Sequence, residues 1–493
     1  MAGRALVDGH VICSGTFSFK LSHRPSKPQI HATASVHHTA ILGKNVVIGA
    51  NTIIGEHVHI HNTAMSDKRK DYEFSLGCKK TEIIPVNQQA TFMGYRRSSG
   101  KVGTRNYIGI ISSVNCSATV CKNIAESFNK DNLSDYENVD GIVPITHGTG
   151  CGINSKGLGW ELLQATIDGY SRHPNFGGLI VIGLGCEVNQ VNGMAQSMSW
   201  ADSDTFKMMT IQEIGGTRKT IEEGIDLVKQ MLPIINKDKR KKCPASEIIL
   251  GLECGGSDAY SGMTANPALG SAVDLLVRNG GTGTLAETPE IFGAEHLLTR
   301  RAINKEVGIK IINFIKWWQQ DYLPKFEENI NQLHQDPSPG NKAGGLTTIL
   351  EKSLGAVAKG GTTNLVDVYQ YAESIKAKGF TFMNTPGYDV TSVTGLIAGG
   401  ANIICFTTGR GSVFGCKPAP SIKLATNDDL YKRMTEDMDV NCGKILLGES
   451  TIEEMGKEIF TLILKIASGK KSKSEINGLG DLEFVPWQMG AIF

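Results

Sequence analysis

The stretch from Ile248 to Glu290 constrains the fold of this chain more than any other. It opens with an apolar run, Ile248–Leu252, whose length indicates a buried strand. A glycine-bearing polar loop and an Asn-Pro pair follow, and they predict the start of an apolar helix over 268–277. A second strand, over 282–286, comes next. Strand, loop, helix and strand in this order predict a parallel sheet with a crossover helix.

Ionisable side chains stand where these two strands end. They are Glu253, Cys254, Asp258 and Glu287. Ligands of open α/β sheets bind beyond the carboxyl ends of the strands, and the adjacent glycines allow close approach of the backbone. The alternative is a set of ordinary turns with capping carboxylates. We expect a ligand site, because functional residues concentrate in such loops.

A second α/β pattern precedes this stretch and begins near Gly94. Apolar strands are predicted over 107–112, 141–145, 179–182 and 208–212, each followed by a glycine-bearing polar loop. None of these loops matches a dinucleotide-binding fingerprint or a P-loop. Their ionisable residues, which should share one rim of a parallel sheet, are Cys116, His147, Cys151, Cys186, Glu187, Arg218 and Lys219.

Just before the first of these strands lies a basic segment. Arg96, Arg97, Lys101 and Arg105 fall within ten residues, among glycines and without a carboxylate. Guanidinium groups suit bidentate recognition of a carboxylate. A solvated basic loop is the alternative, and the sequence leaves both open.

The amino-terminal part differs from the rest. Glycines at positions 43, 49 and 55 follow apolar pairs with a period of six, which is typical of a short left-handed β-helix. The other interpretation is a small β domain whose last strand carries His57, His59 and His61 on one face. Three imidazoles so placed suit a first-row divalent metal, whereas an exposed polar edge is the bland alternative.

Composition excludes several classes of protein. The 493 residues are 40% hydrophobic with a net charge of +1, so we expect no nucleic-acid partner and no anionic membrane surface. The chain lacks a long apolar run and a recognisable signal peptide, so we expect no membrane span and a cytoplasmic location. Its 11 cysteines form no Cys-x-x-Cys pair, which favours reduced thiols.

The spacing of the cysteines in the sequence disfavours an iron–sulfur cluster. Such a cluster usually needs at least two close thiolates, and only Cys116 and Cys121 are near each other in the sequence. A helix starting near Asn115 would put them five residues apart, on poorly matched faces.

The predicted architecture is α/β: two parallel-sheet domains preceded by a small β-rich domain of β-clip, or SAF-like, type. The predicted ranges are 1–88 for the small domain and linker, 89–240 for the second domain and 241–493 for the third. A basic segment, Lys237–Cys243, predicts the hinge between the last two. The apolar residues of Phe484–Phe493 should dock on the core.

Seven segments of the sequence resemble the altronate/galactarate dehydratase family of hydro-lyases, and the resemblance spans roughly Gly94 to the carboxyl end. It implies dehydration of a small-molecule sugar acid to a 2-keto-3-deoxy sugar acid, with Fe(II) or Mn(II). It also favours the β-clip interpretation, because GEHVHIHN resembles the last strand of that domain. The matching segments are GYRRSSGKVGTRNYIGIISSVNCSA, THGTGCGI, GLGCEVNQ, TIQEIGGTRKT, LECGGSDAYSGMTANP, TLAETPEI and MNTPGYDVTS.

Water loss β to a carboxylate needs a base, a cation over the developing enediolate and an acid for the leaving hydroxide. We assign the catalytic roles to His147, Lys219 and Glu187. The substrate ligands are predicted to be Arg96, Arg97, Arg105, Asn106, Asn115 and Asp258. The predicted metal ligands are His59, His61, Glu253 and Cys254.

Two alternatives remain. The first is a lyase of another hydroxy acid, such as sulfolactate. The second is a hexapeptide-repeat scaffold or acyl transferase, which would assemble as a trimer through the amino-terminal part. A homo-oligomer is compatible with either.

Overall fold

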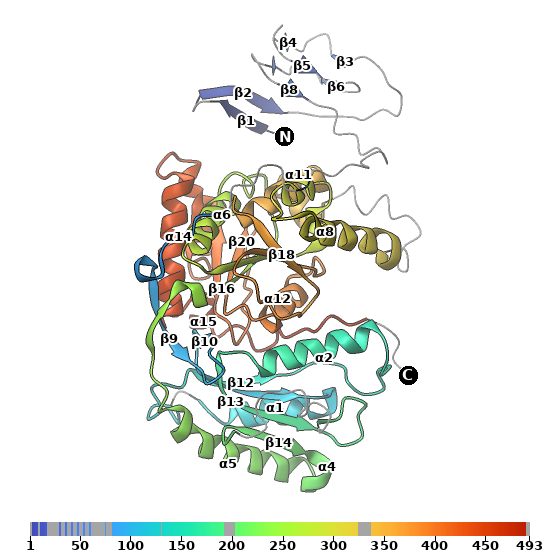
Figure 1. Cartoon of the computed structure of the whole chain (residues 1–493), viewed down its shortest axis with the longest axis vertical. Helices are drawn as coiled ribbons and strands as arrows, with labels where there is room; N and C mark the ends of the chain where they lie inside the picture. The colour runs from blue at the N-terminus through green and yellow to red at the C-terminus, as the bar shows by residue number, and fades with distance from the viewer. Residues whose placement is uncertain are drawn as a thin grey trace. The chain divides into compact units, whose positions relative to one another are not determined.

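The computed structural model describes residues 81–129, 131–191, 203–323 and 337–489, together with Phe74 and the short strands between residues 2 and 60. The chain divides into two compact units: Met1–Tyr72 with Gly345–Thr347, and Glu73–Gly344 with Thr348–Phe493. Figure 1 shows the helices and strands of both. Within the described part, no helix is long and apolar enough to cross a membrane.

The first unit contains a hairpin and three parallel strand pairs. The hairpin joins β1 (Ala2–Val7) to β2 (His10–Thr16). The register pairs are Gln29 with Val47, Ser35 with Ile53 and Ile41 with His59, so each partner lies 18 positions further along. That offset equals three six-residue steps, the pairing of a coil with hexapeptide sides. The strands are β3 (Gln29–Ile30), β4 (Ser35–Val36), β5 (Ile41–Leu42), β6 (Val47–Ile48), β7 (Ile53–Ile54) and β8 (His59–Ile60).

The β-clip domain that the resemblance implied is therefore not confirmed. His59 lies in β8, but its side chain is not among the described ones, and His61 lies outside the described residues. The two histidines stay predicted metal ligands without a described geometry.

The second unit contains a four-stranded sheet in the order β12-β11-β13-β14, all parallel as the sequence predicted. The first two predicted strands have the observed bounds. Because β11→β12 and β12→β13 run in opposite directions across the sheet, right-handed crossovers put α1 and α2 on opposite faces. The elements are β11 (Tyr107–Ser112), α1 (Asn115–Glu126), β12 (Gly141–Ile145), α2 (Leu158–Ser171), β13 (Phe176–Gly183), β14 (Phe206–Thr210), α4 (Ile211–Ile214) and α5 (Thr217–Ile235).

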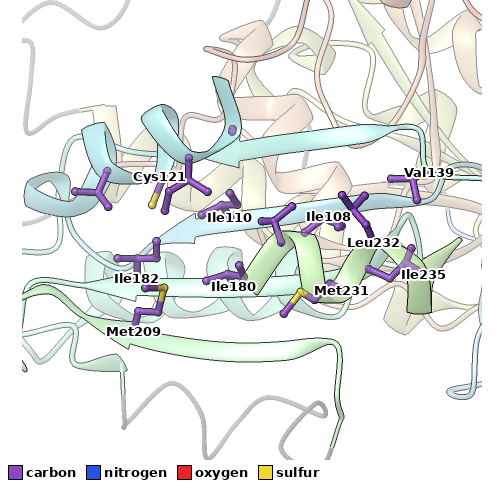
Figure 2. Packing of buried hydrophobic residues seen from close by; sticks show 14 of the residues in the cluster. Ile108, Ile110, Cys121, Val139, Ile180, Ile182, Met209, Met231, Leu232 and Ile235 are labelled. Carbon is purple, nitrogen blue, oxygen red and sulfur yellow. The ribbon is translucent and has the colours of Figure 1, made fainter. Parts of the chain in front are cut away.

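The core under α1 and α5 explains why these segments fold this way. Alternate residues Ile108 and Ile110 of β11 point to this face and are fully buried. Figure 2 shows them in one cluster with Cys121 of α1 and Met231 of α5. Cys121 is thus a core residue, with the burial that free cysteines often have.

A seven-stranded parallel sheet forms the centre of the third predicted domain. Its order is β18-β19-β17-β16-β20-β21-β22. After β16 the chain moves towards β17, and after β20 it moves the other way, so a topological switch point lies between these two neighbours. The strands are β16 (Ile249–Cys254), β17 (Thr282–Leu285), β18 (Leu365–Tyr369), β19 (Gly379–Met383), β20 (Ile403–Thr408), β21 (Ser421–Ala425) and β22 (Val440–Asn441).

Helices cover this sheet, and α14 packs on α6 while α12 packs on α2 of the other sheet. The helices are α6 (Ala265–Arg278), α7 (His296–Thr299), α8 (Lys305–Trp317), α10 (Pro339–Ala343), α11 (Ile349–Val357), α12 (Asp389–Ala398), α13 (Asp428–Arg433), α14 (Ile452–Ala467) and α15 (Lys473–Ile476).

A small antiparallel sheet, β10-β9-β15, occupies the segments predicted as a basic loop and a hinge. It comprises β9 (Thr91–Arg96), β10 (Val102–Gly103) and β15 (Lys241–Pro244). The sequence did not predict these strands, because both segments are rich in charged residues. The strands are also short, so few buried residues such as Phe92 mark them.

Two further features tie the sheets together. The backbone of Gly169 in α2 approaches Ala398 so closely that a Cβ there would lie 2.3 Å from the Ala398 carbonyl oxygen. Residues 483–487 run across both parts, as predicted for a docking segment. Phe484 packs edge-on against Tyr170, and Trp487 stacks on Trp318.

Replacing Gly169 with alanine should therefore destabilise the protein. The added methyl group meets a main-chain oxygen that cannot rotate away, so we expect a loss of about 1–3 kcal/mol in the free energy of unfolding. Urea unfolding measures it. Gly340→Ala in α10 is the control, because nothing lies within 4 Å of a Cβ there. Equal stability of the two variants would contradict the close contact.

Candidate active site

Ionisable side chains crowd together beyond the carboxyl ends of β16 and β17. They come from strand β16, from the segment after β17, from two helices and from a short turn after the first of them, all in the second unit. We call this group the carboxylate centre; its members are Glu253, Cys254, Glu287, Glu290, Lys352, Lys359 and Asp389.

The local fold places each acidic group. Glu253 and Cys254 are the last residues of β16, and Asp389 is the first residue of α12. Glu287 follows β17 with φ 65° and ψ 72°, a left-handed conformation that is costly for a residue other than glycine. Its N–H donates to Thr385 Oγ1 at 2.8 Å, which holds the strained turn. Strain of this kind clusters at functional sites.

Contacts within the centre are short. Cys254 Sγ lies 3.0 Å from Glu290 Oε2 and 3.7 Å from Glu287 Oε2. One ligand oxygen each of Glu253, Glu287 and Asp389 lie within 4.8 Å of one another. Glu253, Cys254 and Glu287 are at most 2% exposed, whereas Asp389 is half-buried. The centre is therefore closed at its base and reaches solvent near Asp389.

Two lysines balance part of the negative charge. Lys352 pairs with Glu290, and Lys359 Nζ lies 3.6 Å from Glu287 Oε2. Burial opposes the charge on each ammonium group, but the neighbouring acidic groups outweigh it and raise both lysine pKa values. Lys352 also keeps Glu290 ionised, because its charge outweighs burial and lowers the Glu290 pKa.

The remaining acidic groups are pushed towards their protonated forms. Burial, and then the charge of Glu253, raises the pKa of Glu287 well above its usual value. Burial raises the pKa of Glu253 as well. Burial and the charges of Glu253 and Glu290 raise the pKa of Asp389 to about 7. A carboxyl group with a pKa near neutrality can either take or give a proton at working pH.

The donor set fits a divalent cation. Glu253 Oε1 and Glu287 Oε1 are buried and receive no hydrogen bond from the described residues. Two adjacent carboxyl groups can satisfy these atoms by sharing a proton, or a cation can do so. Carboxylate oxygens with one thiol suit Fe(II) or Mn(II). Glu253 and Cys254, two of the four predicted metal ligands, thus belong to the centre.

A pocket adjoins the centre at the topological switch point. Its volume is ≈ 490 Å³, and Asp258, Arg410 and Asn427 line it. The two-glycine turn after Cys254 separates it from the centre, since a Cβ at Gly255 would lie 3.3 Å from Asp389 Oδ2 and one at Gly256 2.9 Å from Arg410 Cβ. Glycine at both positions lets the pocket and the carboxylates approach each other.

Asp258 supports the pocket wall. Its side chain accepts hydrogen bonds from Ser261 Oγ, Thr426 Oγ1 and Asn427 Nδ2, each at 2.9 Å. These bonds occupy both oxygens, so the described role of Asp258 is to hold three loops together at the pocket.

Three of the predicted site residues lie at the rim of the four-stranded sheet: Asn115, His147 and Glu187. Asn115 is the first residue of α1, and its Nδ2 reaches the His147 carbonyl at 3.4 Å. Glu187 is buried and accepts from Ser113 Oγ at 2.7 Å and from the Gly185 N–H at 2.6 Å. These hydrogen bonds outweigh burial and lower the Glu187 pKa. Lys219 is exposed on α5.

His147 uses both ring nitrogens in contacts with the main chain. Nε2 donates to the Ser112 carbonyl at 3.1 Å, and Nδ1 accepts from the Thr149 N–H at 3.3 Å. Burial lowers its pKa to about 4, so the ring is neutral at pH 7. As a base it would first have to give up the Thr149 hydrogen bond.

The basic residues lie elsewhere. Arg105 and Asn106 precede β11 and so occupy the amino end of the sheet, opposite the rim. Arg105 is 1% exposed and forms an ion pair with Glu475 at 2.6 Å. Arg97 pairs with Asp238 at 2.7 Å. Arg96, half exposed, has only a 3.9 Å contact with Glu247 as an ion pair among the described residues. The structure does not bring these residues to either rim.

The sequence did not single out four members of the centre. Lys352 and Lys359 come from α11 and from the turn Ala358–Gly360, and only their burial marks them. Asp389 is the first residue of a helix, where aspartate is common without any functional role. Glu290 sits in the segment Glu-Thr-Pro-Glu after a strand, and a second acidic residue three positions beyond Glu287 was the available signal.

Comparisons with known proteins show the family of this chain. The family model "D-galactarate/Altronate dehydratase, C-terminal" matches residues 245–492, and "D-galactarate dehydratase/Altronate hydrolase, second domain" matches 94–236. The chain belongs to the D-galactarate/altronate dehydratase family. Membership makes it an enzyme of the hydro-lyase type, and both candidate sites lie within the matched ranges.

Three relatives illustrate the range of this family. Altronate dehydratase of Bacillus subtilis is 36% identical over 431 residues, 87% of this chain and 84% of the relative. Galactarate dehydratase (L-threo-forming) of Escherichia coli is 40% identical over 404 residues, 80% and 76% of the two chains. The (2R)-sulfolactate sulfo-lyase subunit beta of Chromohalobacter salexigens is 30% identical over 404 residues, 80% and 96%.

The burial of neutral His147 predicts a dependence of stability on pH. Its folded pKa of about 4 lies below the usual 6.5, so its contribution is complete above pH 6.5 and is lost as the pH falls towards 4. The loss is about 1.4 kcal/mol per pH unit, or roughly 3 kcal/mol in all. Urea unfolding at several pH values should show a flatter acid limb for His147→Gln, whose amide can still donate to Ser112. Parallel curves would contradict the assignment.

Proposed function

We propose that this enzyme removes water from a sugar acid of the altronate or galactarate type, giving a 2-keto-3-deoxy sugar acid, and that it does so at the carboxylate centre with a divalent cation. The observation that carries the proposal is the cluster of Glu253, Glu287 and Asp389 oxygens beside a pocket, in which Glu253 Oε1 and Glu287 Oε1 are buried and receive no hydrogen bond from the described residues. The names of two relatives support the substrate class.

The chemistry requires a base and an acid at neighbouring carbons of the substrate. A base takes the proton from the carbon next to the carboxylate, the hydroxyl on the following carbon leaves with a proton as water, and the enol rearranges to the 2-keto acid. Asp389, with a pKa of about 7, suits the exchange of a proton at the open side of the centre.

Positive charge is needed where the enediolate develops. A bound divalent cation supplies it and polarises the leaving hydroxyl. Lys352 and Lys359 remain charged beside the acidic groups and add to the field. Fe(II) and Mn(II) are the proposed ions, with Glu253 and Glu287 as oxygen ligands and Cys254 as the thiol.

The adjoining pocket suits the rest of the substrate. A volume of ≈ 490 Å³ lies within the range of small-molecule sites. Arg410 and Arg433 line it, and arginine side chains recognise carboxylates. A sulfolactate-type substrate is the second candidate, because the sulfo-lyase relative matches most of the chain.

An assay with a panel of sugar acids tests the proposal. With Fe(II) or Mn(II), we expect 2-keto acid to form from altronate or galactarate, and chelation to abolish it. Glu253→Gln should lower kcat/KM by about 10²–10⁴, because a charged ligand of the centre is lost. The matched control is Glu306→Gln, an exposed change in the first turn of α8. No keto acid from any of these substrates would overturn the proposed function.

Metal binding is tested separately with Mn(II), which prefers oxygen ligands. Electron paramagnetic resonance should show about one tight ion per chain, weakened about 10–100-fold in Asp389→Asn and Glu253→Gln. Because protons held by Glu253 and Glu287 must leave, affinity should rise with pH. Wild-type affinity in both variants would place the ion elsewhere.

A further inference from the structure

Three exposed cysteines follow three neighbouring strands of the four-stranded sheet. Cys116 is the second residue of α1 after β11, Cys151 lies in the loop after β12, and Cys186 lies in the loop after β13. The order β12-β11-β13 puts Cys116 in the middle. All three follow the carboxyl ends of parallel strands, so their loops stand at the same rim. We call them the three-cysteine rim.

The register aligns two of these cysteines. Ser112 of β11 pairs with Ile182 of β13. Cys116 lies four residues beyond Ser112, and Cys186 lies four residues beyond Ile182. The two cysteines therefore stand at the same distance along the chain from paired residues of adjacent strands.

Close packing brings in the third loop. A Cβ at Gly150, beside Cys151, would lie 2.5 Å from the Ser113 carbonyl oxygen, and Gly150 has φ +102°. Only glycine allows this approach without strain. The Asn189 N–H donates to the Gly150 carbonyl at 3.4 Å, so the Cys151 loop contacts the loops of both other cysteines.

Polar bonds fix the same three loops to one another. Ser113 Oγ donates to Glu187, the residue after Cys186, at 2.7 Å. Asn189 Nδ2 donates to the Ser113 carbonyl at 2.8 Å, and the Asn115 N–H donates to the Thr149 carbonyl at 2.9 Å. Hydrogen bonds thus hold the three loops of the rim together, and the three cysteines are exposed on them.

The spacing of the sulfurs argues against a single bound ion. Among the described residues, the trios of histidine, cysteine or acidic residues whose ligand atoms all lie within 4.8 Å of one another belong to the carboxylate centre. The three rim sulfurs are not such a trio, so at least one pair of them lies further apart than 4.8 Å. One tetrahedral ion with bonds near ~2.3 Å needs sulfurs about 3.8 Å apart. An iron–sulfur cube does not need this close contact, because it holds its thiolates at roughly 6–7 Å from one another.

Charge also favours such a group. Cys116 stands at the amino end of a 12-residue helix, where the helix dipole stabilises an anion. A cube held by three thiolates carries net negative charge, so this position suits it.

We propose that Cys116, Cys151 and Cys186 bind a [4Fe–4S] cluster through three thiolates, at a site separate from the carboxylate centre. With three cysteine ligands, one iron keeps an open position for an oxygen ligand such as water, a hydroxyl or a carboxylate. The site does not depend on the proposed reaction.

The full chain, purified without oxygen and supplied with iron, sulfide and a thiol reductant, tests this assignment. We expect about four iron and four acid-labile sulfide per chain, with a broad visible absorption band. Cys116→Ser, Cys151→Ser and Cys186→Ser should each lose most of the labile sulfide, and the triple variant all of it. Circular dichroism checks that these exposed substitutions leave the fold intact.

Cys121→Ala is the matched control on the same helix, since Cys121 is a buried core residue, and it should keep the cluster. Zinc or iron without labile sulfide in the wild-type chain would overturn the proposal, as would full sulfide content in the triple variant. Keto-acid formation is not measured here, so failure of the proposed function and failure of the cluster are distinguishable.

Discussion

Burial of four carboxyl groups beside two ammonium groups is the constraint on which the larger sheet depends. Removing a carboxylate from water is costly unless it is paired or neutralised. Lys352 and Lys359 reach the centre only because α11 and the following turn lie against α6 and η3, the turn Thr288–Ile291. The remaining excess of negative charge must be met by protons or by a cation, and that need is what makes the centre chemically useful.

The backbone reflects the same constraint. Glu287 accepts a left-handed conformation although a glycine would adopt it more easily. The strain brings its carboxyl group beside that of Glu253, and Ser392 Oγ holds the other side of Glu253 at 2.8 Å. The two carboxyl groups are thus held at an electrostatically unfavourable distance, and the surrounding interactions compensate for its cost.

Much of the fold could be predicted from the sequence, because parallel strands are apolar runs that end in glycine-bearing loops. Glu253 and Cys254 were found for this reason. Lys352 and Asp389 were not, since tertiary packing brings them from helices remote in the chain. The prediction that Arg105 binds substrate overlooked its position in the sequence. Arg105 precedes the first strand, so it lies at the amino end of a parallel sheet and not at the rim where ligands bind.

The cysteines also show that distance along the chain is a poor guide to which residues lie close together. Proximity along the chain suggested Cys116 and Cys121, but helical geometry buries Cys121 in the core. Strand register instead aligns Cys116 with Cys186, 70 positions away in the sequence. The six-residue periodicity of the amino-terminal part agrees with the parallel pairing of its short strands, whereas the family resemblance favoured a β-clip domain.

The segment with Phe484 and Trp487 has a consequence for synthesis of the enzyme. Phe484 contacts Tyr170 and lies 6.2 Å, ring to ring, from His147, while Trp487 stacks on Trp318. These partners lie on helices and loops of both sheets, and all of them precede the segment in the sequence. During synthesis the two sheets therefore lack their shared clamp until residues 484–487 have left the ribosome, however early each sheet forms.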